Sequence, residues 1–120
     1  MHIISQVLIA LVSLLFLYIM YLETIATSSA KTSKVFNIPQ DVLREKHFTT
    51  LMKNQGVYNG LIALALLCSD FCSENGKELS CILLVYCILV AAYGALTSSW
   101  KILIQQGFLP FLALLSLLIL

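Results

Sequence analysis

Four long apolar runs limit what this chain can fold into more than any other feature. Each approaches the roughly 20 helical residues that cross a hydrocarbon core of about 30 Å. The runs extend from Ile3 to Leu22, Thr49 to Cys68, Leu79 to Thr97 and Ile102 to Leu120. None alternates as a membrane β-strand does, so helices must satisfy the backbone in lipid. The sequence therefore predicts an all-α, polytopic membrane protein, a single four-transmembrane-helix bundle over residues 1–120.

Composition excludes two other classes of protein. With 60% apolar and 11% charged residues, the chain is too apolar for a soluble domain of 120 residues. A net charge of +1, without a basic cluster among aromatic residues, excludes nucleic-acid binding. The first run lacks a basic start and is longer than the apolar part of a signal peptide, so we expect it to be retained as a span.

The charged residues separate by loop. Six of the basic residues fall on the side of the first and third loops: Lys31, Lys34, Arg44, Lys46, Lys53 and Lys101. The middle loop is acidic, with Asp70, Glu74 and Glu78 against Lys77. By the positive-inside rule, the loop of residues 23–48 is cytoplasmic and both termini lie outside the plasma (inner) membrane. Within that loop, Thr27 to Ser33 lacks helical patterning, and we expect an exposed connection.

The start of the second span is unusually polar. Its sequence is Asn54-Gln55-Gly56-Val57-Tyr58-Asn59-Gly60, and the span reaches 20 residues only if these amides enter the membrane. At about 100° per residue, Asn54, Gln55, Tyr58 and Asn59 share one arc of roughly 140°. An unpaired amide in hydrocarbon costs several kcal/mol, so this arc should face protein or water.

Gly56 and Gly60 form a G-x-x-x-G pair on another face of the same span. Such a pair lets two helix backbones approach closely. The predicted contact is with another span of the same chain, and a homodimer contact is the alternative.

Other spans place polar groups at a similar depth. Glu23 ends the first span, and Gln105 and Gln106 lie about one turn inside the fourth span. Gly107 and Pro110 should bend the helix beside these glutamines, because proline cannot donate to the Gln106 carbonyl. Tyr93 brings a hydroxyl to the same half of the bundle; packing in an aromatic seam is the alternative for it. The predicted ligand-binding set is Glu23, Asn54, Gln55, Tyr58, Asn59, Tyr93, Gln105 and Gln106.

The remaining chemistry is sparse. Four cysteines allow three complete pairings, and free thiols are preferred over a bridge from Cys72 to Cys81 or Cys68. His2 and His47 fall on opposite sides of the membrane, so they cannot share one metal site or catalytic pair. We predict no catalytic residue, no metal site and no cofactor.

Several segments of the chain together resemble a known family. They are Tyr18 to Glu23, Lys34 to Phe36, Asn54 to Gly60, Tyr93-Gly94 and Lys101 to Pro110. The chain is similar to the DUF1304 family of small bacterial integral membrane proteins, whose specific signature is the Asn-Gln-Gly-x-Tyr-Asn-Gly block. The resemblance implies four helices in a bacterial inner membrane and no established activity. Members often carry Glu-His where this chain has Leu15 and Phe16, which argues against proton transfer at that position.

Four functions compete on these observations. The leading hypothesis is a protein whose intramembrane polar pocket binds or transports a small amphipathic molecule or a membrane lipid. The alternatives are a small multidrug-type exporter, a membrane enzyme acting on lipid with Glu23 as acid or base, and a structural subunit of a membrane complex. The exporter is opposed by the terminal position of Glu23 and by the strong charge bias.

Overall fold

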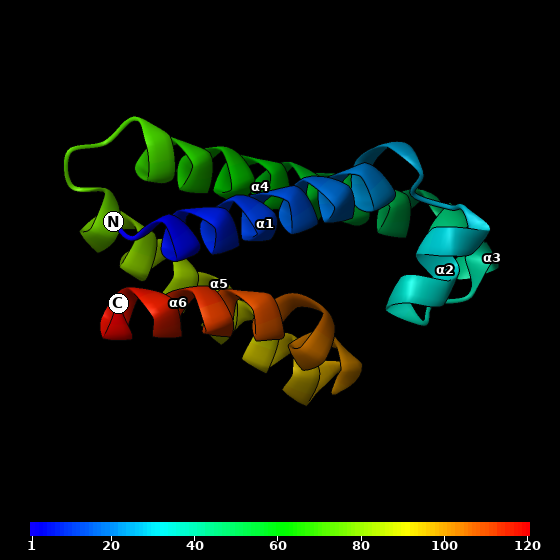
Figure 1. The fold of residues 1–120 in the computed structure, drawn as a ribbon. Coiled ribbons are helices and arrows are strands. Elements are labelled where there is room, and N and C mark those ends of the chain that lie inside the picture. Colours follow the sequence, from blue (N-terminus) through cyan, green and yellow to red (C-terminus); the bar gives the residue numbers. More distant parts are fainter. The chain divides into compact units, whose positions relative to one another are not determined.

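The computed structural model describes residues 1–120 and confirms the predicted all-α class (Figure 1). The chain contains six α-helices and two short π-helical segments. In chain order these are α1 (Ile3–Met20), η1 (Tyr21–Ile25), α2 (Ala30–Phe36), α3 (Gln40–Arg44), α4 (Lys46–Phe71), α5 (Gly76–Thr97), η2 (Leu103–Gly107) and α6 (Phe108–Ile119).

Two helices are long and apolar enough to cross a membrane, judged by length and composition. They are Ile3–Ile25, which runs through α1 and η1, and Gly76–Thr97, which is α5. The Leu103–Ile119 segment is apolar but shorter. Helix α4 has 26 residues, yet the amides in its first half make it less apolar than these two. The fold thus provides two helices that are both long and apolar enough to span a membrane, where the sequence predicts four spans.

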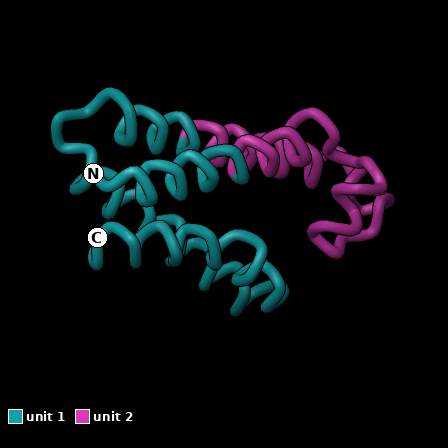
Figure 2. Tube along the Cα trace, in the orientation of Figure 1, with its two compact units in different colours: residues 1–15, 62–120 teal, residues 16–61 magenta.

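The chain divides into two compact units (Figure 2). Unit 1 comprises residues 1–15 and 62–120, and unit 2 comprises residues 16–61. Helices α1 and α4 each contribute to both units, whereas α5, η2 and α6 belong to unit 1 and η1, α2 and α3 to unit 2. The two units are described separately below.

Unit 1 is held together by small residues and paired hydroxyls. The Ser5 and Ser116 hydroxyl oxygens lie 2.9 Å apart, which joins α1 to α6. The Ser69 and Ser80 hydroxyl oxygens lie 2.8 Å apart and join α4 to α5. Ser69 and Ser116 also donate to the Leu66 and Ala113 carbonyls, so the two pairs supply partners to the buried hydroxyls of Ser5 and Ser80.

The predicted bend beside the fourth-span glutamines coincides with η2. This segment ends at Gly107, where an added Cβ would lie 3.3 Å from the Ala91 Cβ of α5. Regular α-helical geometry resumes in α6, whose first turn contains buried Pro110. Because proline lacks an amide hydrogen, the wider π turn occurs where the ladder of hydrogen bonds must already be interrupted.

The exposed connection predicted for Thr27 to Ser33 is wrong, because helix α2 begins within it. The Ser29 hydroxyl caps this helix by accepting a hydrogen bond from the Thr32 backbone N–H. Asn37 ends it in the left-handed conformation, with φ of 55°. Thr32 is fully buried. Serine before a short helix and asparagine after it are common terminal signals, and the low apolarity of the segment obscured them.

The middle loop is shorter than predicted, and Asp70 does not belong to it. Asp70 lies in the last turn of α4 and is 5% exposed, with no hydrogen-bond partner for either carboxylate oxygen. Burial raises the pKa of the Asp70 carboxyl above its ordinary value. The folded chain therefore binds this proton more tightly than the unfolded chain does, and the charged form weakens folding.

Replacing Asp70 with asparagine should therefore stabilise the protein at neutral pH. Stability linked to a raised carboxyl pKa is present at low pH and is lost as pH rises through the folded pKa. We expect Asp70→Asn to gain about 1 to 3 kcal/mol at pH 7, because burying a neutral amide costs less than burying a charged carboxylate. The gain should shrink as pH approaches about 4, where aspartate protonates even when unfolded. Thermal melting in detergent at both pH values checks this, with the exposed Glu78→Gln as control; equal gains at both would contradict it.

Candidate functional site

Unit 2 contains a buried carboxylate that is bound by two amides. Glu23 is fully buried, although its position at the end of a span had also allowed a merely solvated side chain. Gln55 Nε2 donates to Glu23 Oε2 at 2.6 Å, and Asn59 Nδ2 donates to Glu23 Oε1 at 2.6 Å. Each carboxylate oxygen thus accepts one short hydrogen bond. Gln55 and Asn59 are four residues apart and therefore lie on the same face of α4.

Three side chains hold the backbone of η1 in place beneath this site. A helix that ends leaves its last carbonyls without partners. Here the Thr32 hydroxyl donates to the Leu22 carbonyl at 3.0 Å, and the Thr27 hydroxyl donates to the Glu23 carbonyl at 2.7 Å. The Lys53 ammonium donates to the Thr24 carbonyl at 3.2 Å. The π turn that carries Glu23 is therefore fixed from several directions.

The two glycines of α4 allow the close approach that the site requires. Gly56 and Gly60 are buried, and both face the end of the first helix in the same chain. A Cβ added at Gly56 would collide with Thr24 Oγ1 and would lie 3.1 Å from the Glu23 Cβ. A Cβ added at Gly60 would lie 2.5 Å from Met20 Sδ. Any larger residue at position 56 would push α4 away from the carboxylate.

Two other predicted ligand residues of unit 2 lie outside this group. Asn54 and Tyr58 share the amide arc but lie on its exposed side, with Tyr58 68% exposed. Tyr93, Gln105 and Gln106 belong to unit 1, where Tyr93 is exposed on α5 and both glutamines lie in the π turn η2. Of the five predicted residues in unit 2, the structure thus brings together Glu23, Gln55 and Asn59.

The site consists of a buried carboxyl group without a cationic partner. No Lys or Arg forms an ion pair with the Glu23 carboxylate, and its hydrogen bonds come from neutral amides. Gln55 is exposed and Asn59 is half-buried, so the two amides form the cover between the carboxylate and the surface. Such an arrangement suits recognition of a polar group rather than chemistry, because no second acid or base contacts Glu23.

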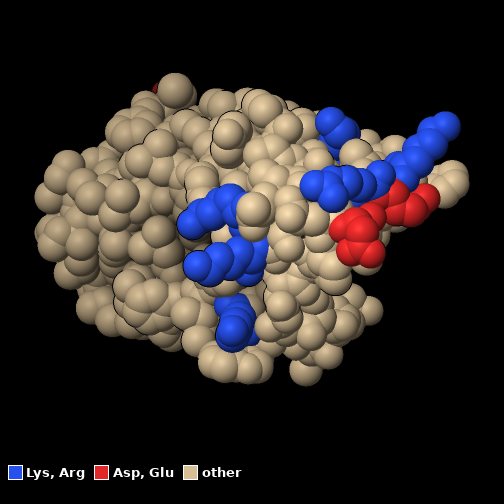
Figure 3. Space-filling view, turned by 90° about the vertical axis from the view of Figure 1, so that its right-hand side faces the viewer, with Lys and Arg blue, Asp and Glu red and all other residues tan.

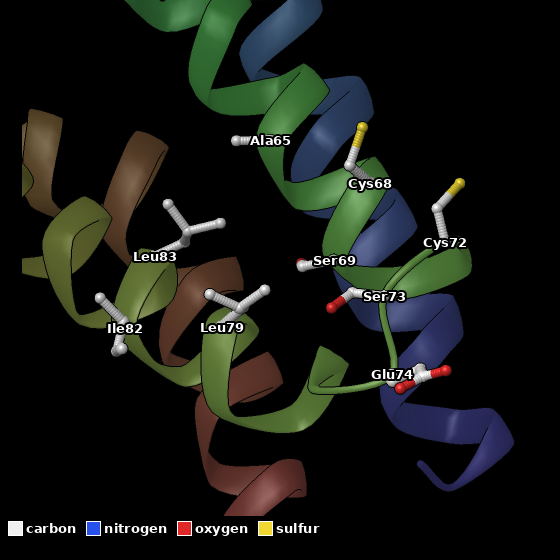
Figure 4. A pocket seen from close by; sticks show the side chains of 9 residues that line it. All are labelled: Ala65, Cys68, Ser69, Cys72, Ser73, Glu74, Leu79, Ile82 and Leu83. Atoms are coloured by element: carbon white, nitrogen blue, oxygen red, sulfur yellow. The ribbon is translucent and has the colours of Figure 1, made fainter.

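Unit 1 has a groove that is lined by different residues from those of the carboxylate site. A groove of about 610 Å³ lies between the end of α4 and the start of α5 (Figure 4). Cys68 and Cys72 point to the same side of α4, and Leu79 and Leu83 form the opposite wall. All four cysteines are free thiols, and none of the predicted ligand residues lines this groove. No group of three or more His, Cys, Asp or Glu side chains could hold a metal ion.

Basic side chains outnumber acidic ones on the exposed surface of unit 2. The space-filling view shows several separate lysine or arginine side chains and less acidic surface (Figure 3). Unit 2 supplies Lys31, Lys34, Arg44, Lys46 and Lys53, all exposed. The charge bias in the sequence is thus also a bias of the exposed surface.

Comparison with known proteins supports the resemblance seen in the sequence. The family model described as "Protein of unknown function (DUF1304)" matches residues 10–118. The chain is 53% identical over 116 residues to the "Uncharacterized protein YpaA" of Lactococcus lactis subsp. lactis (strain IL1403), covering 97% of this chain and 98% of that protein. No solved structure matches. The matched family model covers the whole carboxylate and amide site, and the chain therefore belongs to the DUF1304 family of proteins of unknown function.

Proposed function

We propose that this chain is a multi-pass protein of the bacterial inner membrane that binds or transports a small amphipathic molecule or lipid at Glu23, Gln55 and Asn59. In this proposal four spans form one bundle, residues 23–48 are cytoplasmic and both termini are outside. The observation that carries the proposal is the fully buried Glu23 carboxylate, which has two short amide hydrogen bonds and no cation.

The exposed surface supports the membrane part of the proposal. In the most apolar window of α5 only 22% of residues are buried within the chain. Large apolar side chains are therefore exposed along this helix, among them Ile82, Leu89 and Leu96. Contiguous apolar surface of this extent is rare on monomeric soluble proteins and fits contact with lipid.

The free-energy cost of burying Glu23 supports the binding part of the proposal. A carboxylate removed from water is costly unless it is paired, and two neutral amides compensate only part of that cost. Ionisable groups within membrane segments are rare and usually functional. The π-helical turn that presents Glu23 is also a form that occurs frequently at functional sites.

The variant Asn59→Leu tests the proposal. It removes the donor to Glu23 Oε1 and should lower basal stability by about 1 to 3 kcal/mol, because a buried acceptor loses its partner. It should also abolish the rise in melting temperature that added lipid extract gives the wild-type protein in detergent. Asn54→Leu is the matched control, since Asn54 is an exposed amide on the same helix and should leave the lipid-dependent shift intact. An Asn59→Leu protein that melts lower but keeps its full shift would show that the amide is only structural.

A further inference from the structure

The hydrogen bonds of the site define which part of a ligand it can accept. A carboxylate only accepts hydrogen bonds, so Gln55 and Asn59 must turn their nitrogen atoms toward Glu23. Their carbonyl oxygens consequently face away from it. Carboxylate and carbonyl oxygens are all acceptors, so a ligand group that enters here must supply hydrogen-bond donors.

The cover of the site indicates how a ligand would enter. Glu23 is fully buried, while Gln55 is exposed and is attached to α4 by a flexible side chain. A ligand that reaches Glu23 must displace Gln55 and must then replace its N–H donor to Oε2. A group without N–H or O–H would leave that oxygen unpaired, which is a substantial penalty for a buried charged acceptor.

The charge of the Glu23 carboxylate further narrows the chemical class of the ligand. The carboxylate lacks an ion-pair partner, so a cationic donor gains electrostatic attraction that a neutral hydroxyl does not. We infer that the ligand of this site is an amphiphile with a primary ammonium group, which bonds to Glu23 in place of Gln55 and to the amide carbonyl oxygens. This inference rests on the proposed binding function and specifies the chemical class of its ligand.

Two sources share this chemistry, an aminophospholipid headgroup and a single-chain amine. Lys53 favours the aminophospholipid. Its ammonium donates to the carbonyl of Thr24, the residue next to Glu23, and its side chain is exposed. A phosphate two carbon atoms from an ammonium group would then meet a lysine beside the carboxylate. A simple alkylamine has no group for Lys53 to bind.

The experiment measures binding to the full-length protein in a nonionic detergent with two matched pairs of probes. Dodecylamine is compared with dodecyltrimethylammonium, and lysophosphatidylethanolamine with lysophosphatidylcholine. Within each pair the charge is the same and three N–H groups are replaced by three N-methyl groups. In the wild-type protein the primary ammonium probe should bind at least about tenfold more tightly than its quaternary partner, because a hydrogen bond to a charged group is lost. Glu23→Gln should remove that preference, and in Lys53→Met lysophosphatidylethanolamine should lose its advantage over dodecylamine.

The outcomes distinguish the ammonium inference from the proposed binding function. The comparison of probes in the wild-type protein does not require any variant to fold. Equal binding within both pairs, or a preference that persists in Glu23→Gln, overturns the ammonium inference. If both probes of a pair bind equally and both lose binding in Asn59→Leu, the proposed site stands and only its ligand class is wrong. If no probe depends on Asn59 or Glu23, both proposals fail. Preference for dodecylamine without one for lysophosphatidylethanolamine assigns the site to single-chain amines.

Discussion

Replacing Gly56 with leucine should leave almost no folded protein. Any side chain at this position points at the backbone and side chain of Thr24, where an added Cβ would lie 3.2 Å from the backbone nitrogen and closer still to Oγ1. A backbone atom within a helix cannot move aside as the end of a flexible side chain can. Even Gly56→Ala should cost about 1 to 3 kcal/mol, the usual penalty for overpacking. The yield of monodisperse protein and its melting temperature in detergent measure both effects.

Two other glycines provide graded controls for this prediction. At Gly60 the added Cβ meets Met20 Sδ, which belongs to a flexible side chain, so Gly60→Ala should cost less than Gly56→Ala. At Gly94 it meets only the Ile102 side chain, at 3.2 Å. Gly94→Ala should be neutral or stabilising, because alanine favours a helix over glycine by about 1 kcal/mol. A Gly56→Leu protein that folds normally but loses a dimer would place the glycine contact between chains instead.

Labelling of single cysteines in intact cells should give an all-or-none difference between positions before and after α4. Cys72 is an exposed free thiol just after α4, and Lys34 is exposed on α2. If the positive-inside rule sets the orientation, Cys72 faces outward and should react with an impermeant maleimide. A Lys34→Cys protein that lacks the native cysteines should react only after the cells are opened.

The labelling design has to allow for the neighbouring thiols. Cys68 is also exposed, so the Cys72 measurement needs the other three cysteines replaced by serine. A signal from Lys34→Cys in intact cells, with Cys72 silent, would reverse the topology. Labelling of both sites in intact cells would indicate that the segment between them crosses the membrane an even number of times or not at all, instead of once, and a four-span bundle in this orientation would be wrong.

The sequence alone was sufficient for the features that depend on neighbouring residues. Runs of apolar residues determine helices, because a helix satisfies its own backbone locally. Helical periodicity also placed Gly56 and Gly60 apart from the amide arc, since the angle between two residues on one helix is fixed by their spacing. The interruption near Gln106 was foreseeable for the same reason, because Pro110 removes a hydrogen bond within its own turn.

The tertiary structure decided which of the predicted polar residues contact one another and which are buried. Four polar residues share one arc of α4, but only Gln55 and Asn59 reach Glu23, because the position of η1 around α4 depends on contacts distant in the sequence. Helix α2 escaped prediction because Thr32 is buried and bonds to the carbonyls of Leu22 in η1 and of Ala26 just after it, which local polarity cannot reveal. Asp70 was assigned to a polar loop for the same reason. Its burial arises from packing against distant segments, and a sequence records the type of a side chain without recording what surrounds it.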